Sequence, residues 1–80
     1  MLLVDYIETL EDVQLTQIIR DQEILDERGH IGDCVLRETI EDYLEVAGIE
    51  GTPLSFWMSP ISTQAYRVYA LRYIDEHGKL

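Results

Sequence analysis

The sequence predicts an all-α fold, a compact bundle of three main helices that forms a single acidic helical domain over residues 1–80. Eighty residues, of which 46% are apolar, are enough for one small core and too few for a second domain. Apolar residues recur at steps of three and four along three segments, which is the spacing of one helix face. A glycine follows each segment, where it can end a helix.

The first main helix is expected to begin near Thr9-Leu10-Glu11-Asp12. This tetrapeptide resembles a capping box in which Asp12 stands in for the usual Glu or Gln. The apolar residues that follow fall on one helical face or on its flanks: Leu10, Val13, Leu15, Ile18, Ile19, Ile24 and Leu25. The helix should end near Arg28-Gly29. The pattern leaves open whether residues 2–8 form a short extra N-terminal helix or continue into this one.

The second main helix has the clearest pattern in the chain. Asp33 is a suitable N-cap for a helix over residues 34–47. Its apolar stripe consists of Leu36, Ile40, Tyr43, Leu44 and Ala47. Gly48 followed by Ile49 predicts a Schellman ending, in which the isoleucine folds back on the last turn.

The third main helix is expected over residues 60–77, with Gly78 after it. Ser59-Pro60 predicts an N-cap followed by proline at the first helical position. Residues 51–59 are then an irregular connection pressed against the core, and this connection carries Leu54, Phe56, Trp57 and Met58.

Negative charge is concentrated in one part of the chain. Sixteen acidic and six basic residues give a net charge of −10. Residues 1–50 hold fourteen acids against three arginines, a balance of −11, whereas residues 51–80 hold two acids against three basic residues, a balance of +1. No linker composition separates the two parts, so the asymmetry belongs to one domain.

The carboxylates of the first fifty residues predict an outward-facing acidic ridge that binds a partner. On the second helix, four acids spaced three or four residues apart span an arc of roughly 100°, opposite the apolar stripe. The predicted ridge comprises Glu38, Glu41, Asp42, Glu45, Asp5, Glu8, Asp12, Asp21, Glu23, Asp26 and Glu27. Duplex DNA is also a regular surface of closely spaced negative charge, so such a ridge can compete for a basic nucleic-acid groove. The alternative is a solvated helix face whose acidity serves only solubility.

An aromatic patch is the second candidate for a binding surface. Its residues are Trp57, Tyr66, Tyr69 and Tyr73. The three tyrosines fall within a narrow arc of the third helix, and tyrosine and tryptophan are enriched at binding hot spots. The alternatives are tyrosines at the core boundary with their hydroxyls in water, and a homodimer formed through this helix.

Several functions are not expected from this sequence. We expect no enzyme, no catalytic residue, no metal site and no cofactor, because two histidines and Cys34 form no recognisable zinc pattern and no phosphate-binding or nucleophile motif is present. Direct nucleic-acid binding is disfavoured because the chain would repel phosphates. The apolar runs are too short for a membrane span or a signal peptide, and a lone cysteine favours a reducing, cytoplasmic location.

In size, charge and lack of catalytic residues, the chain resembles a loose class of small acidic proteins with which phages block host machinery, including anti-CRISPR proteins and DNA mimics. This resemblance implies a non-catalytic inhibitor or regulator of a basic, nucleic-acid-binding protein, acting in the host cytoplasm if the chain is phage-encoded. It transfers no individual residue and no architecture. The alternative is a helical assembly or adaptor protein that oligomerises through Tyr66, Tyr69 and Tyr73.

Overall fold

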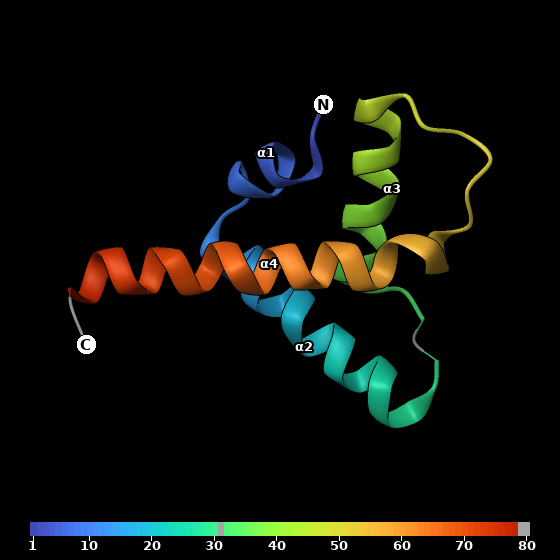
Figure 1. Cartoon of the computed structure of the whole chain (residues 1–80). Helices are drawn as coiled ribbons and strands as arrows, with labels where there is room; N and C mark the ends of the chain where they lie inside the picture. The colour runs from blue at the N-terminus through green and yellow to red at the C-terminus, as the bar shows by residue number, and fades with distance from the viewer. Residues whose placement is uncertain (31, 79–80) are drawn as a thin grey trace.

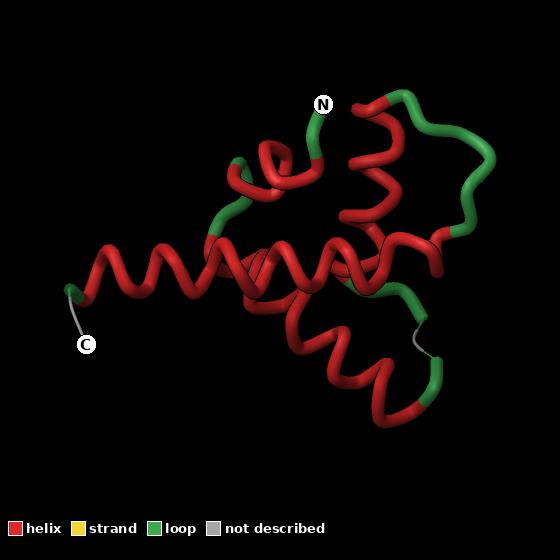
Figure 2. The backbone as a smooth tube through the Cα atoms, in the orientation of Figure 1, coloured by secondary structure: helices red, strands yellow, loops and turns green. Residues whose placement is uncertain are grey.

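A computed structural model describes residues 1–30 and 32–78, and these residues form four helices. The helices are α1 (Leu3–Glu8), α2 (Asp12–Arg28), α3 (Val35–Ala47) and α4 (Leu54–His77). The prediction of an all-α bundle with three main helices is confirmed, and residues 3–8 form the separate short helix (Figures 1 and 2).

The long helix α4 is the central element, because it contacts each of the other three helices. In Figure 1, α1 and α3 lie on one side of α4 and α2 lies on the other. Helices α2 and α3 also contact each other. The C-terminal part of α4 extends beyond the other helices, and no residue of α4 after Val68 is buried.

All four helices contribute to one core. Its buried apolar residues are Tyr6, Ile7, Leu15, Ile18, Leu36, Ile40, Tyr43, Ile61, Ala65 and Val68. Each large aliphatic side chain in this set contributes on the order of 1.5–3 kcal/mol through burial.

The start of α2 differs from the expected capping box. The N-cap is Glu11, whose backbone N–H donates to Gln14 Oε1 at 3.0 Å while its own side chain caps the helix. Thr9 instead closes α1 by donating its hydroxyl to the Tyr6 carbonyl at 2.6 Å. Val13, expected on the buried face, is 70% exposed. The end of the helix is as predicted, with Gly29 at φ +78°.

Helix α3 follows its predicted bounds to within one residue. Its N-cap is Cys34 instead of Asp33, and the Cys34 sulfur accepts from the Arg37 N–H at 3.4 Å. The Schellman ending is confirmed, because Gly48 has φ +70° and the Ile49 N–H donates to the Leu44 carbonyl at 2.9 Å.

Helix α4 begins six residues earlier than expected, so the prediction of an irregular connection is wrong for residues 54–59 and holds only for residues 51–53. Pro53 is the N-cap, and Pro60 lies inside the helix. The reason is the stripe formed by Leu54, Trp57 and Met58, which are half-buried against the core. Their spacing continues without a break into Ile61, so packing outweighs the cost of one proline in the helix.

Arg72 of α4 forms hydrogen bonds that stabilise the connection between α1 and α2. Its Nη2 donates to the Glu8 carbonyl at 2.7 Å, and its Nη1 donates to the Leu10 carbonyl at 2.8 Å and to Asp12 Oδ1 at 2.9 Å. The last carbonyls of a helix have no partner within it, and a guanidinium offers several donors in a fixed plane. This one side chain therefore joins three elements.

Candidate protein-binding surfaces

The acidic row of α3, defined as Glu38, Glu41, Asp42 and Glu45, is exposed along its whole length. It lies opposite the buried face of the same helix, as its spacing predicts. Neighbouring members are one turn apart, so their Cβ atoms are about 5–6 Å from each other. The result is a regular line of carboxylates on the outside of α3.

Little positive charge neutralises this row. Within the described residues, its one ion pair joins Arg37 Nε to Glu41 Oε1 at 3.6 Å, and both side chains are about half exposed. Exposed pairs of this kind are worth little, so they do not explain why the row exists. Glu38 and Glu45 have no ion pair within the same part of the chain.

Asp42 connects the row to α1. The Tyr6 hydroxyl donates to Asp42 Oδ2, and the ring of Tyr6 lies 5.3 Å from that of Tyr43. Burial raises the pKa of Tyr6 far above its ordinary value, and the hydrogen bond to the Asp42 carboxylate and its negative charge raise it further. This contact could not be predicted from local sequence patterns, because Tyr6 and Asp42 are 36 residues apart in the chain.

The three N-terminal acids of the predicted ridge do not lie along one helix. Asp5 and Glu8 are exposed on α1, but Asp12 begins α2 and is paired with Arg72 at 2.9 Å. Asp5 and Glu8 therefore add to the negative surface, whereas Asp12 helps to hold α1, α2 and α4 together.

Asp21 is buried, so its inclusion in the predicted acidic ridge was wrong. The residue is 4% exposed. Its Oδ2 accepts from the Leu36 N–H at 3.0 Å, and its Oδ1 accepts from Gln17 Nε2 at 2.9 Å. The carboxylate thus caps the first turn of α3 from α2, where free N–H groups favour negative charge.

Glu23, Asp26 and Glu27 are exposed on the outer face of α2. Helices α2 and α3 extend to opposite sides of α4 in Figure 1, so these three acids and the acidic row of α3 form two surfaces. The expectation of one continuous ridge is therefore corrected to two separate acidic faces.

The members of the predicted aromatic patch have different surroundings. Trp57 is half-buried, its ring lies 5.5 Å from Tyr43, and its indole N–H donates to Thr52 Oγ1 at 3.0 Å. Tyr69 is half-buried against the core. Tyr66 and Tyr73 are 64% and 52% exposed, so these two are the tyrosines that a partner can reach.

Two aliphatic residues of α4 outside the predicted aromatic patch are also exposed. Leu71 and Ile74 are about half exposed on the part of α4 that projects from the bundle. Ile74 falls on the far side of the helix from Ile61 and Ala65, which was the available signal, whereas Leu71 falls at the edge of the aliphatic arc. Ile74, Tyr66 and Tyr73 fall within an arc of about 100° of the helix, and these three residues form what we call the α4 apolar face.

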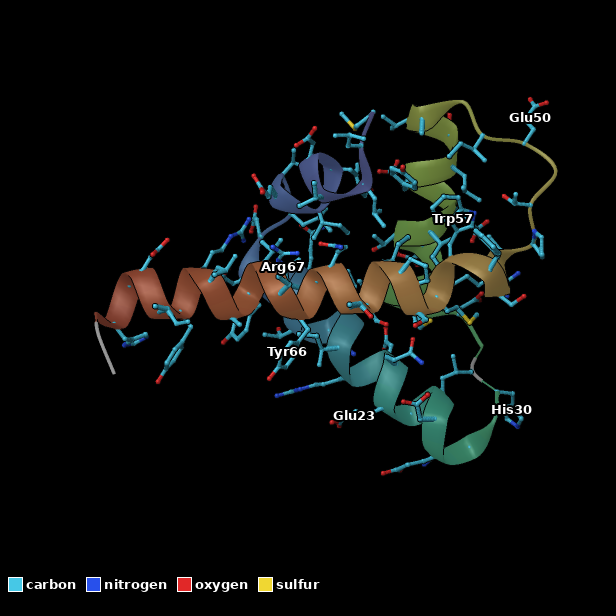
Figure 3. The ribbon with its side chains drawn as sticks, viewed as in Figure 1. Glu23, His30, Glu50, Trp57, Tyr66 and Arg67 are labelled. Carbon is cyan, nitrogen blue, oxygen red and sulfur yellow. The ribbon has the colours of Figure 1, made fainter. Side chains whose placement is uncertain are left out.

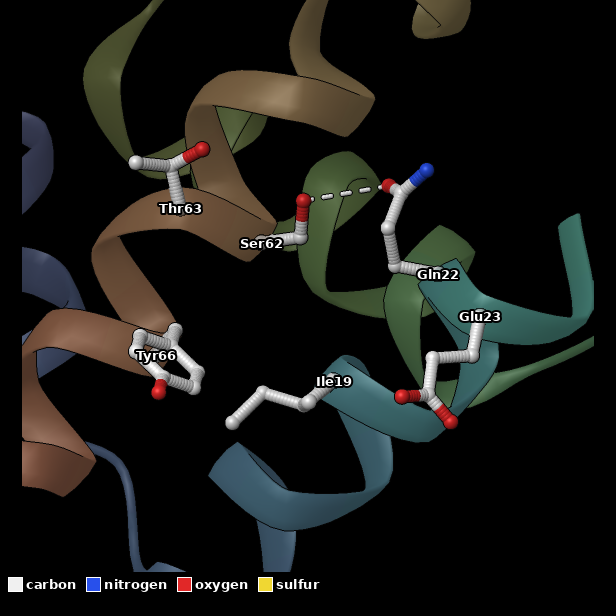
Figure 4. Close-up of a pocket in the computed structure, with 6 residues that line it drawn as sticks. All are labelled: Ile19, Gln22, Glu23, Ser62, Thr63 and Tyr66. Carbon is white, nitrogen blue, oxygen red and sulfur yellow. Dashed lines mark hydrogen bonds between the residues drawn. The ribbon is translucent and has the colours of Figure 1, made fainter. Parts of the chain in front are cut away.

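A groove of about 270 Å³ lies between α2 and α4 (Figure 4). It is lined by Ile19, Gln22, Glu23, Ser62, Thr63 and Tyr66. In the close-up, Ile19 lies between Tyr66 on one wall and Glu23 on the other, and Figure 3 labels the same two residues on α4 and α2 in the whole molecule. Ser62 donates its hydroxyl to Gln22 Oε1 at 3.1 Å across the two helices.

The described residues, 1–30 and 32–78, contain no group of three or more side chains placed to hold a metal ion. None of their helices is both long and apolar enough to cross a membrane. What the arrangement offers chemically is charge and apolar surface for docking. Comparisons with protein families, with curated proteins and with solved structures found no match to this chain.

Proposed function

We propose that this protein is a non-catalytic regulator that binds a basic, nucleic-acid-binding protein through the acidic row of α3. The observation that supports this proposal is the row itself, four exposed carboxylates with one ion pair within the described residues. Aligned like charges cost free energy, and a chain of 80 residues has little stability to spare. A basic partner would turn that repulsion into attraction.

The finer proposal is an inhibitor of the phage type, such as an anti-CRISPR protein or a DNA mimic, acting in the cytoplasm. The spacing of charge favours it, since carboxylates one helical turn apart and the phosphates of duplex DNA are both regular anionic arrays. Complementary charge mainly raises the association rate and the specificity, so short-range contacts must supply the rest of the affinity.

Affinity capture with a charge-reversed variant tests the proposal. The variant carries Glu38→Lys and Glu45→Lys, two positions without an ion pair in the described part of the chain. The matched control carries Asp75→Lys and Glu76→Lys, the same charge change on α4. Lysate of the native cell or host is applied at two salt concentrations, about 0.05 and 0.3 M, and captured proteins are challenged with duplex DNA.

The expected result is capture of basic proteins that salt and DNA both release, with a much larger loss for the α3 variant than for the control. Binding that salt does not weaken, or an equal loss for the two variants, would remove the acidic row from the mechanism.

A second candidate function is a homo-oligomeric assembly or adaptor protein, which the α4 apolar face favours. Tyr66, Tyr73 and Ile74 are 44–64% exposed on one side of α4, and exposed apolar surface of this kind often marks an interface. Sedimentation at micromolar concentration tests it with Tyr73→Ser and Ile74→Ser, and with the exposed Val46→Ser of α3 as the control. A dimer that resists salt and is lost in the α4 variant supports assembly, whereas a monomer contradicts it.

A further inference from the structure

The groove between α2 and α4 combines an apolar wall with the carboxylate of Glu23, which forms no ion pair with a described residue. From this we infer that the groove receives an arginine or lysine side chain of the basic partner. The inference rests on the proposed function, because it takes the partner to be basic. It concerns a surface separate from the acidic row of α3, however, so the two can be tested apart.

The walls of the groove suit the aliphatic stem of such a side chain. Ile19 supplies aliphatic surface, and the ring of Tyr66 stands beside it with 64% of the residue exposed (Figure 4). Lysine and arginine bury their methylene stems on apolar surface while the charged head remains near polar groups. The face of a tyrosine ring also attracts a cation electrostatically.

The polar groups of the groove leave one strong acceptor free. Gln22 is engaged at both ends, since its Nε2 donates to Asp26 Oδ1 at 3.0 Å and its Oε1 accepts from Ser62. Ser62 is also within 3.2 Å of the Ser59 carbonyl. The Glu23 carboxylate and the Thr63 hydroxyl remain, and Glu23 forms no ion pair with any described residue.

The charge around the groove selects the sign of the ligand. Glu23 is the one charged residue among those that line it, and the exposed residues of α2 nearby are two acids, Asp26 and Glu27, and one cation, Arg20, so the local balance is negative. An anion would be repelled here, and an uncharged apolar side chain would cover the carboxylate without pairing it. A guanidinium or ammonium group pairs the carboxylate and uses the apolar wall at the same time.

A pair of short peptides tests this inference directly. The probe is acetyl-Ala-Ala-Arg-Ala-Ala-amide, and its control carries citrulline, the uncharged isostere of arginine, at the same position. Both are titrated into the full chain at constant ionic strength, and binding is followed by NMR at the Ile19 methyl groups, Thr63 and the Tyr66 ring. We expect saturable shifts at these three residues with the arginine peptide and much weaker shifts with the citrulline peptide.

Three variants test which residues of the protein contact the arginine side chain of the peptide. Glu23→Gln and Tyr66→Ala should each weaken binding of the arginine peptide about threefold, the size of an exposed ion pair or cation–π contact. Glu27→Gln removes the same charge one turn further along α2, outside the groove, and should change binding by much less. Equal binding of the two peptides, no saturable shift, or equal effects of Glu23→Gln and Glu27→Gln would overturn the inference.

The outcome is distinguishable from failure of the proposed function. If basic proteins are captured through α3 while the arginine peptide does not bind, the groove assignment is wrong and the proposed function stands. If the peptide binds in the groove while no basic protein is captured, the groove assignment stands and the proposed function fails.

Discussion

Asp21 shows how a single buried carboxylate can join two helices. It is 4% exposed and accepts one hydrogen bond from the α3 backbone and one from Gln17 on its own helix. A residue that looks like surface charge in the sequence is therefore a structural group. Its position was detectable, because Ile18, Asp21 and Leu25 are spaced as one helix face.

We expect Asp21→Ala to lower the free energy of unfolding by about 2 kcal/mol, because the Leu36 N–H would be left buried without a partner. The measurement is urea unfolding followed by circular dichroism. Asp26→Ala is the control, since Asp26 also accepts from a glutamine four residues earlier but is exposed, and it should change stability by less than about 0.5 kcal/mol. Equal losses in the two variants would contradict a capping role.

Tyr6 makes stability depend on alkaline pH. Burial and the bond to Asp42 raise the pKa of its phenol in the folded state. Above about pH 10 the unfolded chain loses this proton and the folded chain keeps it, so the stabilisation present at neutral pH is lost as pH rises.

Tyr6→Phe should therefore cost about 1 kcal/mol at neutral pH and flatten the decline in stability above about pH 10. Chemical unfolding of both proteins across this pH range measures the difference. Tyr66→Phe, at an exposed position, should leave the decline as it is in the parent chain. A parallel decline in Tyr6→Phe and the parent would show that Tyr6 is not responsible.

At the scale of elements, α4 carries an internal proline. Pro60 has no N–H for the carbonyl of Phe56, one turn earlier, and proline in a helix interior costs on the order of 3 kcal/mol. The half-buried Leu54, Trp57 and Met58 keep the first turns helical despite this cost.

Pro60→Ala should raise the melting temperature, because it restores that hydrogen bond, and the gain should be about 1 kcal/mol or more after the greater freedom of the unfolded chain is subtracted. Thermal unfolding by circular dichroism measures it. Pro53→Ala, at the N-cap, restores no such bond and should give no comparable gain. A loss of stability in Pro60→Ala would indicate a helix that begins at Ser59.

The sequence was most informative where the determinants are local. The stripe of α3 and its Gly48-Ile49 ending are short-range features, and both were predicted. The start of α4 was missed because Ser59-Pro60 carries a strong local start signal, while the competing signal is packing onto distant helices. The bond between Tyr6 and Asp42 could not be predicted, since it joins residues 36 positions apart.

The candidate binding surfaces also combine features that local sequence determines with features that depend on the packing of distant helices. Exposure of the acidic row followed from its helical spacing. The spacing of the tyrosines did not show which of them are exposed, because Tyr69 falls in the same arc as Tyr66 and Tyr73 but packs against the core. The separation of the acids into two faces depends on the directions of α2 and α3, which no spacing within one helix can specify.

For the whole molecule, the net charge of −10 with two ion pairs in the described residues implies repulsion throughout the surface. Raising the salt concentration from about 0.02 to about 0.2 M should therefore raise the melting temperature by a few degrees. Replacing Glu38 and Glu45 by glutamine should give a smaller salt response with the fold unchanged. A melting temperature that falls with added salt would mean that attractive pairs dominate.

The long-range contacts of Arg72 also affect how the chain folds during its synthesis on the ribosome. The junction that follows α1 is secured by a side chain more than sixty residues further along. Until Arg72 has been synthesised, the connection between α1 and α2 lacks the hydrogen bonds that this side chain donates. Native closure of this corner therefore waits until residue 72 has been synthesised, and a nascent chain stalled before that residue would expose Ile7 and its apolar neighbours to chaperones.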